Sequence, residues 1–281
     1  MATSKSLGEH EISNNGNGSR EDGGKDAADE GLVKKTNKLL PWKIIYQNIQ
    51  GLITENSKVK LDYLKEYSKE NNILLMNFTE TWLNKFIQKD TKINGYQIFR
   101  GDRRKRKRGG TAIYLNDQYE ARHISEMSVD RNELTAVYIE KLNTINMVIY
   151  RPPDTKLSAF APILEKVKDI LRNVSGPDPT IIITGDFNFP FIRWIRGPDN
   201  GCRWEIKPNT RFTNDEKEQF NRLYEIMDKN NLIQIIEEPT RERNTLDLVF
   251  TNEISMFTHT EVTKSSFSDH HLIELTTNIK K

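Results

Sequence analysis

Short apolar runs separated by turns recur from Trp42 to the end of the chain, and they constrain the fold more than any other feature of the sequence. Several are rich in β-branched residues, as in Thr180-Ile-Ile-Ile-Thr184, which is typical of strands buried on both faces of a sheet. The predicted strands are Lys43–Asn48, Ile73–Glu80, Thr111–Leu115, Leu134–Glu140, Ile145–Tyr150, Thr180–Asp186, Leu246–Thr251 and His271–Thr276.

Helical periodicity occurs between these runs. The pattern predicts helices over Ser57–Asn71, Lys156–Asn173 and Thr213–Asn231. The last begins with a capping-box pattern formed by Thr213 and Glu216. The expected apolar stripe of the first consists of Val59, Tyr63, Leu64 and Tyr67. Strands interrupted by packed helices favour an α/β sandwich with two sheets and the helices outside.

The first 38 residues have a different composition, rich in Gly, Asn, Ser, Asp and Glu and without an aromatic residue. Such a segment buries too little apolar surface to offset the entropy of ordering. We therefore expect a disordered polar tail over 1–38 and one folded domain over 39–281.

Cysteine usage and hydropathy exclude several classes of protein. The single cysteine, Cys202, rules out an intramolecular disulfide and a multi-cysteine zinc site. No apolar stretch approaches the roughly 18 residues of a membrane-spanning helix, and the N-terminus lacks a signal-peptide segment. We expect an intracellular protein that does not associate with membranes.

Candidate chemistry lies at the ends of the apolar runs. Asp186 and Asn188, in Gly185-Asp-Phe-Asn188, follow a buried strand two residues apart and are therefore expected on one face at the sheet edge. An ordinary Asp/Asn turn explains this pair equally well. Glu80 and Asn48 end two other runs, and each taken alone is typical of a solvated residue.

One histidine stands among acids near the C-terminus, in Ser268-Asp269-His270-His271. A catalytic imidazole needs a carboxylate on its other ring nitrogen to hold one tautomer, and either Asp247 or Asp269 could supply it. Taken alone, His270 fits a surface turn better.

The order of these segments is more specific than any one of them. Asn48, Glu80, Tyr150-Arg-Pro-Pro, Gly-Asp-Phe-Asn, Thr-Leu-Asp and Ser-Asp-His follow one another along the chain. In this order the chain resembles the endonuclease/exonuclease/phosphatase superfamily, from about Trp42 to its last strand. It resembles most closely the endonuclease domain of LINE-type (non-LTR, jockey-like) retrotransposons, through the segments 185–190, 238–252 and 109–114.

The resemblance implies a four-layered α/β sandwich, with two packed mixed β-sheets flanked by helices and a metal site at one rim. Glu80 would hold Mg²⁺ or Mn²⁺ with Asn48 beside it, and Asp269 would lie near the metal and the phosphate. Hard oxygen ligands of this kind suit these ions better than zinc.

The resemblance also implies catalytic roles. Asp186 would orient or deprotonate the attacking water, and Asn188 and Tyr150 would contact the scissile phosphate. His270 would stabilise charge on that phosphate while Asp247 orients its ring. Whether Asp186 or His270 is the general base stays open at this stage.

The implied activity is a metal-dependent endonuclease that nicks DNA and leaves a 3′-hydroxyl. Two alternatives remain: a phosphatase or phosphodiesterase that acts on a small phosphorylated substrate, and a retrotransposon remnant that binds DNA without cutting it. We expect the protein to be a monomer that binds DNA. Because retrotransposon relatives are usually followed by a reverse transcriptase and this chain ends at Lys281, we expect any such polymerase to be encoded elsewhere.

Seven cations fall between Arg100 and Arg108, although the net charge of the chain is only +2. This run predicts a hairpin loop that contacts the DNA backbone, or a nuclear-import patch. The expected DNA-binding residues are Arg103, Arg104, Lys105, Arg106, Lys107, Arg108 and, because relatives place this position near substrate, Thr240. Trp82, Trp194 and Trp204 could stack on bases, but core packing is favoured. Arg193 stands where close relatives are expected to carry an acid.

Overall fold

The strands of this chain assemble into two mixed sheets, seen in a computed structural model that describes residues 40–53, 58–84, 91–103, 108–173 and 177–280. These residues belong to the compact unit Leu39–Lys281. The predicted polar tail, 1–38, lies outside the described residues and remains a prediction. No helix in the described part of the chain has the length and apolar character needed to cross a membrane.

The six-stranded sheet has the order β13 (Phe257–Thr263), β14 (Leu272–Lys280), β1 (Pro41–Asn48), β2 (Ile73–Thr79), β4 (Thr111–Asn116) and β3 (Tyr96–Gly101). The eight-stranded sheet has the order β5 (Ala121–Val129), β6 (Asn132–Ile139), β7 (Thr144–Tyr150), β8 (Thr180–Asp186), β12 (Asp247–Thr251), β11 (Ile233–Gln234), β10 (Cys202–Ile206) and β9 (Ile192–Arg196). Each sheet contains one parallel pair, β1 with β2 and β7 with β8, while the other pairs are antiparallel.

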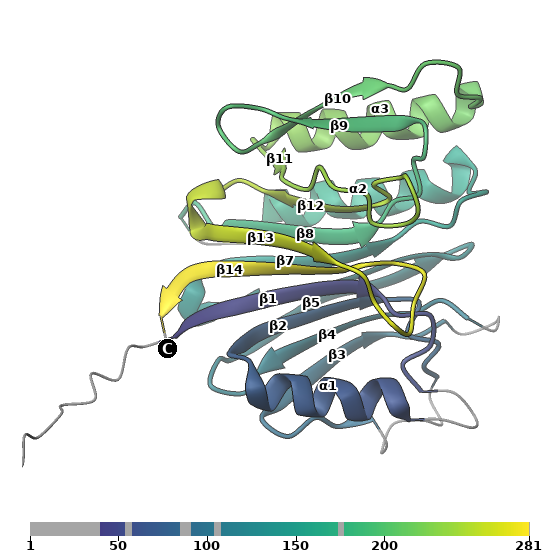
Figure 1. Cartoon of the computed structure of the whole chain (residues 1–281). Coiled ribbons are helices and arrows are strands. Elements are labelled where there is room, and N and C mark those ends of the chain that lie inside the picture. The colour runs from purple at the N-terminus through teal and green to yellow at the C-terminus, as the bar shows by residue number, and fades with distance from the viewer. Residues whose placement is uncertain (1–39, 54–57, 85–90, 104–107, 174–176, 281) are drawn as a thin grey trace, which may run out of the picture. The chain divides into compact units, whose positions relative to one another are not determined.

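Three helices cover the outer faces of the described unit (Figure 1). One apolar cluster joins α1 (Val59–Glu70) to the six-stranded sheet, and a second joins α2 (Leu157–Asn173) and α3 (Asn214–Lys229) to the eight-stranded sheet. A third cluster lies between the two sheets. Short 3₁₀ turns occupy Glu140–Leu142 and Ile254–Met256. The layers are helix, sheet, sheet and helix, which confirms the predicted sandwich.

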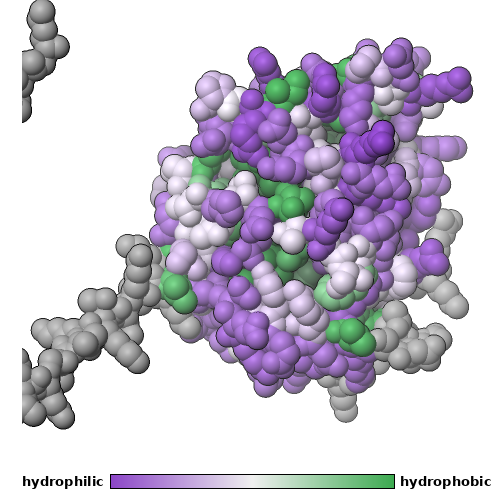
Figure 2. All heavy atoms as spheres, viewed as in Figure 1, coloured by the Kyte–Doolittle hydropathy of each residue, from purple (hydrophilic) through white to green (hydrophobic). Residues whose placement is uncertain are grey.

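Strand β8 shows why its sequence is almost continuously apolar. Ile181 and Ile183 belong to the cluster under the helices, whereas Ile182 belongs to the cluster between the sheets. Both faces of the strand are therefore buried, as its β-branched composition predicts. Hydrophilic residues cover most of the face seen in Figure 2, and hydrophobic ones are exposed there only in small groups.

Helix α3 begins as the sequence predicts. The Thr213 hydroxyl accepts a hydrogen bond from the backbone N–H of Glu216, and the Glu216 carboxylate accepts one from the backbone N–H of Thr213. These reciprocal bonds satisfy two donors that a helix N-terminus otherwise leaves unpaired.

The stripe predicted for α1 is wrong in part. The residues that α1 buries are Leu61 and Leu64, whereas Val59 and Tyr63 are exposed. Tyr63 instead packs its ring against Tyr67 and Phe267 at the side of the helix. The aromatic side chains can remain partly in water because their rings pack on one another. Two of the tryptophans for which core packing was predicted are packed as expected: Trp194 is in the core and Trp204 packs on Phe220.

Gly185 permits a close approach between two central strands. A Cβ atom built there would collide with the backbone oxygen of Ile149 in β7. We expect Gly185→Ala to lower the free energy of unfolding by about 1–3 kcal/mol, since forcing an atom into a packed core costs that much. Denaturant unfolding measures it.

Gly95→Asn is the matched control, because Gly95 has open space around its Cβ position and a positive φ that Asn tolerates. Its free energy of unfolding should change by less than about 1 kcal/mol. Equal stabilities of the Gly185→Ala and wild-type proteins would contradict this account of β8.

Candidate active site

Strand register alone brings several polar side chains to one edge of both sheets. In the eight-stranded sheet, Tyr150 at the end of β7 pairs with Asp186 at the end of β8, which pairs in turn with Asp247 at the start of β12. In the six-stranded sheet, Asn48 at the end of β1 pairs with Thr79, the last residue of β2 before Glu80. Parallel strands end at a common edge, so these groups collect there.

His270 reaches the same place from the segment before β14. The Ser268 hydroxyl donates to the backbone oxygen of Asn48 at 2.7 Å and accepts from the backbone N–H of His270 at 3.1 Å. The Gln47 side chain donates to the backbone oxygen of His270 at 2.9 Å. These bonds attach the histidine segment to the end of β1.

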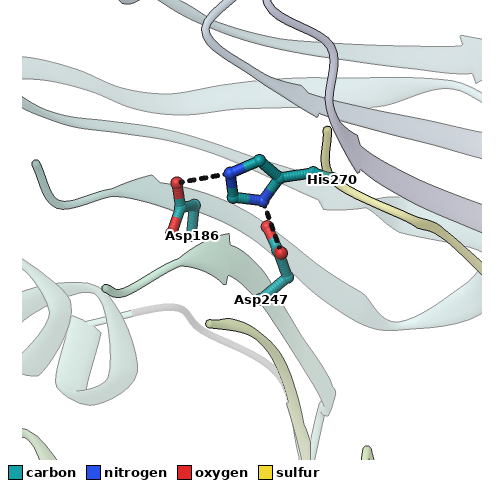
Figure 3. A group of neighbouring side chains, drawn as sticks. All are labelled: Asp186, Asp247 and His270. Carbon is teal, nitrogen blue, oxygen red and sulfur yellow. Dashed lines mark hydrogen bonds and ion pairs between the residues drawn. The ribbon is translucent and has the colours of Figure 1, made fainter. Parts of the chain in front are cut away.

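The His270 imidazole lies between two carboxylates (Figure 3). Its Nδ1 is 2.7 Å from Oδ2 of Asp247, and its Nε2 is 3.9 Å from Oδ2 of Asp186. The side chain is almost fully buried, so His270 is not a surface-turn histidine. Of the two acids that the sequence left open, Asp247 bonds to Nδ1, whereas Asp269 lies 3.9 Å from Nε2.

Both carboxylate oxygens of Asp247 have a hydrogen-bond partner. Its Oδ1 accepts from the Tyr46 hydroxyl at 3.0 Å, while its Oδ2 is bonded to His270. Burial, together with the charge of Asp247, raises the pKa of Tyr46 well above its usual range, so this phenol stays a donor. The arrangement suits a carboxylate that orients an imidazole, and it suits a metal ligand poorly.

The side-chain amide of Asn48 lies between the two other acids. Its nitrogen donates to Oε1 of Glu80 at 3.0 Å and to Oδ2 of Asp186 at 2.9 Å. The Tyr150 hydroxyl donates to the same Glu80 oxygen at 3.0 Å. Burial, then the Glu80 and Asp186 carboxylates, raises the pKa of Tyr150, so it too remains a neutral donor.

The charges of this cluster perturb one another. Burial raises the pKa of Asp186, with the Asp247 and Glu80 carboxylates adding to the effect and His270 and Asn48 opposing it. Burial lowers the pKa of His270, but the carboxylates of Asp247, Asp186 and Asp269 outweigh it and raise the value to about 9. The imidazole is therefore protonated at neutral pH, and the raised pKa of Asp186 favours the neutral form of that carboxyl group.

The oxygen-rich side of the cluster fits a divalent cation. Oδ1 of Asp186 is buried and has no hydrogen-bond partner within the described residues. Such an oxygen is costly unless a further partner approaches it. Glu80 and Asp186 supply carboxylate oxygens, and Asn48 would supply its amide oxygen after rotation of the amide, a donor set that Mg²⁺ and Mn²⁺ prefer. One possible ligand atom each from Asp186, Asp247 and His270 also lies within 4.8 Å of the others. Asp247 and His270, however, are already bonded to each other through Oδ2 and Nδ1.

Asp269, the third predicted metal residue, is half exposed. Its Oδ2 forms an ion pair of 2.5 Å with the Arg241 guanidinium. Glu80 and Asn48 are thus in direct contact with each other, whereas Asp269 lies beyond the imidazole. The metal-binding role of each remains a prediction.

Asn188 follows β8 in a tight turn with a positive φ of 50°. Its amide nitrogen donates to the backbone oxygen of Arg151 at 2.9 Å, and its own backbone oxygen accepts from the Arg151 guanidinium at 3.1 Å. Arg151 is fully buried and also holds the backbone oxygen of Phe187 at 3.0 Å. This arginine fixes the turn that follows Asp186, a role the sequence analysis missed.

Thr240 stabilises the backbone at the start of β12, next to the site. It is fully buried, and its hydroxyl accepts from the backbone N–H groups of Leu246 and Asp247, each at 3.0 Å. A buried hydroxyl that is used in this way does not reach DNA. The structure therefore replaces the predicted DNA contact by a role in fixing the start of β12.

The basic run joins β3 to β4, as a hairpin loop would, but Arg104, Lys105, Arg106 and Lys107 lie outside the described residues. Arg103 pairs with the buried carboxylate of Glu133 at 2.6 Å. The same carboxylate accepts from the backbone N–H of Gly110 at 2.7 Å, where φ is +92°. The base of the loop is thereby fixed on β6, which neighbours β7 and Tyr150.

Trp82 is a site residue that the sequence analysis assigned to the core. Its indole N–H donates to Oε2 of Glu80 at 3.2 Å, and the Arg108 guanidinium lies 5.3 Å from the centre of its ring. Both Glu80 and Trp82 have positive φ angles. Tyr46 lies two residues before Asn48 on β1, so the alternation of side chains along a strand predicts that both point to the same face. No local sequence pattern marks Trp82 as a site residue.

Arg193, which stands where close relatives are expected to carry an acid, pairs with Glu205 across β9 and β10.

Comparisons with known proteins agree with this fold. Residues 144–274 match the model of a family described as endonuclease-reverse transcriptase. The endonuclease domain of TRAS1, a telomere-specific non-LTR retrotransposon, aligns with a TM-score of 0.57 and 14% identity, over 86% of this chain and 100% of that one. Residues 144–274 thus resemble this family, and the chain shares the fold of the TRAS1 domain.

The same fold occurs in enzymes that act on different substrates. An AP endonuclease from Archaeoglobus fulgidus aligns with a TM-score of 0.58 and 16% identity, over 85% of this chain and 100% of that one. A mannosyl-6-phosphatase from Bacteroides thetaiotaomicron aligns with a TM-score of 0.51 and 11% identity, over 83% and 98%. At these identities the likeness establishes the fold of hydrolytic nucleases and phosphatases. No curated protein matches the sequence.

Proposed function

We propose that this protein is a metal-dependent endonuclease of retrotransposon origin that hydrolyses DNA phosphodiester bonds and leaves a 3′-hydroxyl at each nick. One observation carries the proposal: the carboxylates of Glu80 and Asp186 and the imidazole of His270 form a single cluster at the shared edge of two sheets. The description of the matched family and the likeness to the TRAS1 domain support the retrotransposon origin.

In the proposed site, Glu80, Asn48 and Asp186 hold the cation. When bound, a Mg²⁺ ion supplies Lewis-acid stabilisation of the charge that develops on the phosphate. The remaining chemical roles are assigned to side chains of the protein. Asp186, which is buried in this cluster, is also proposed to orient or deprotonate the attacking water.

His270 acts as an imidazolium. Because the Asp247 carboxylate holds its charged form, the imidazole is a poor proton acceptor at neutral pH and a good donor to a phosphate oxygen. Tyr150 and Asn188 are proposed to contact the same phosphate. The cations of the run Arg103–Arg108 are proposed to bind the DNA backbone, which makes binding salt-dependent. Arg103, at the base of this run, already pairs with Glu133.

Conversion of supercoiled plasmid to the open circle in Mg²⁺ tests the proposal. Wild type should nick, and DNA polymerase should extend the nick because it carries a 3′-hydroxyl. Asp186→Ala should lower the rate by on the order of 10³-fold, since both a ligand and a base are lost.

Asp228→Ala, which alters an exposed carboxylate on α3, is the matched control and should nick as wild type does. Equal nicking by Asp186→Ala would reject the site. Phosphate release from small esters without nicking would favour a phosphatase. DNA binding with no Mg²⁺-dependent cleavage would favour an inactive remnant.

Trp82→Phe probes the support of Glu80. Phenylalanine keeps an aromatic ring under Arg108 but lacks the N–H that bonds to Oε2 of Glu80. We expect the Mg²⁺ concentration for half-maximal nicking to rise by about 10-fold, as for other groups that orient a metal ligand. A Mg²⁺ titration of the nicking rate measures it. An unchanged midpoint would assign Trp82 to packing alone.

A further inference from the structure

A tight turn before β12 presents an arginine beside the site. Arg241 and Asn244 exchange two backbone hydrogen bonds, of 3.0 and 2.9 Å, which close the turn. The preceding residue, Thr240, is bonded to the N–H groups of Leu246 and Asp247. The backbone of Arg241 is therefore fixed with respect to the carboxylate that orients His270.

The Arg241 side chain is connected to His270 through one carboxylate. Its Nη2 lies 2.5 Å from Oδ2 of Asp269, and Oδ1 of Asp269 lies 3.9 Å from Nε2 of His270. The guanidinium and the imidazole therefore flank the same acid. The Arg241 side chain is 38% exposed and that of Asp269 45%, so this side of the cluster opens to solvent.

A guanidinium placed in this way can bind a phosphate. It carries five N–H donors in a planar fork, and the ion pair with Asp269 involves one of its nitrogens, Nη2. The neighbouring carboxylates of Asp186, Asp247 and Asp269 repel a polyanion, so a fixed cation at the rim offsets that repulsion.

We propose that Arg241 is a substrate-binding residue of this site, which holds a phosphate oxygen of the nucleic acid strand next to His270. The proposal rests on the proposed function, since it takes DNA as the substrate. It assigns Arg241 a direct contact with phosphate, beyond the neutralisation of Asp269.

Equilibrium binding of a fluorescent DNA duplex in EDTA, at several salt concentrations, tests the proposal without cleavage. Arg241→Ala should weaken binding by about 10-fold and reduce the slope of log K against log salt by about 0.9, the contribution of one phosphate. Arg241→Lys should lose less, because it keeps the charge but not the fork. Arg243→Ala, in the same turn and exposed, is the matched control and should bind as wild type does.

A double variant separates a phosphate contact from mere neutralisation of Asp269. If Arg241 only offsets the Asp269 charge, Asp269→Asn will restore DNA affinity to Arg241→Ala. If Arg241 holds phosphate, the double variant will still bind several-fold more weakly than Asp269→Asn alone. Thermal unfolding of each variant accompanies the binding curves, and unchanged midpoints show that the fold is retained.

The outcomes for this residue and for the proposed function differ. A wild type that binds DNA through Arg241 yet does not nick plasmid supports this inference and rejects the nuclease proposal. A wild type that nicks plasmid while Arg241→Ala binds and cleaves equally well rejects only this inference. Restoration by Asp269→Asn, or a wild type that binds no duplex, also overturns it.

Discussion

Asp247→Asn is expected to lower the rate of Mg²⁺-dependent nicking by on the order of 10³-fold while the fold survives. The asparagine is isosteric, and the Tyr46 hydroxyl can rotate to accept from its amide, so the packing of this buried site is kept. What disappears is the negative charge that holds His270 as an imidazolium. Initial rates on supercoiled plasmid measure the loss.

The pH dependence gives this prediction a second readout. In wild type the activity that needs the imidazolium should fall as the pH rises through about 9, the raised pKa of His270. Without the Asp247 charge this pKa falls, so the decline should begin at lower pH. Tyr46→Phe is the control, because it keeps the Asp247 carboxylate and removes only the hydroxyl that donates to it. Its activity should fall over the same alkaline pH range as that of wild type. If the activity of Asp247→Asn falls at the same pH as that of wild type, the role given to Asp247 is contradicted.

Glu80→Gln is expected to reduce nicking by on the order of 10³-fold, because the metal contributes several kcal/mol to the transition state. The substitution keeps the size of the side chain, so the bonds from Asn48 and Tyr150 to its remaining oxygen persist. It removes the charge that would attract the cation.

Thermal unfolding in Mg²⁺ separates metal loss from other causes. A ligand that binds the folded state raises stability by RT ln(1 + [L]/Kd), about 2.7 kcal/mol at one hundred times Kd. Mg²⁺ should therefore raise the unfolding temperature of wild type and leave that of Glu80→Gln nearly unchanged. Glu140→Gln, on an exposed turn, is the control and should respond to Mg²⁺ as wild type does. A normal Mg²⁺ response in Glu80→Gln would place the metal elsewhere.

Local sequence predicted the central elements of the fold well. The eight strands expected from apolar runs and all three expected helices are present, because burial on two faces selects continuous β-branched runs and a capping box marks a helix start. The strands that the pattern missed are β3, β5, β9 and β13, which form the four sheet edges, and β10 and β11 near one of them.

Edge strands escape prediction for a physical reason. An edge strand such as β5 or β13 has a neighbour on one side only and partly faces water, so polar residues alternate through it and no apolar run forms. Their pairing depends on a neighbouring strand that is already in place. Local composition therefore carries little information about them.

The site divides in the same way. The sequence by itself determined which residue types stand at the ends of buried strands, because a strand that is apolar on both faces can carry polar chemistry only where it ends. It also determined the order of these groups along the chain, from Asn48 to His270.

Only the tertiary structure decided which of them meet. Pairing of β7 with β8 and of β8 with β12 puts Tyr150, Asp186 and Asp247 in one row, and packing of the second sheet brings Asn48, Glu80 and His270 against it. It selected Asp247 over Asp269 for Nδ1 of His270, buried Thr240, and turned Trp82 toward Glu80. Most of these contacts join residues far apart in sequence, and their geometry follows from register and packing, which no local pattern encodes.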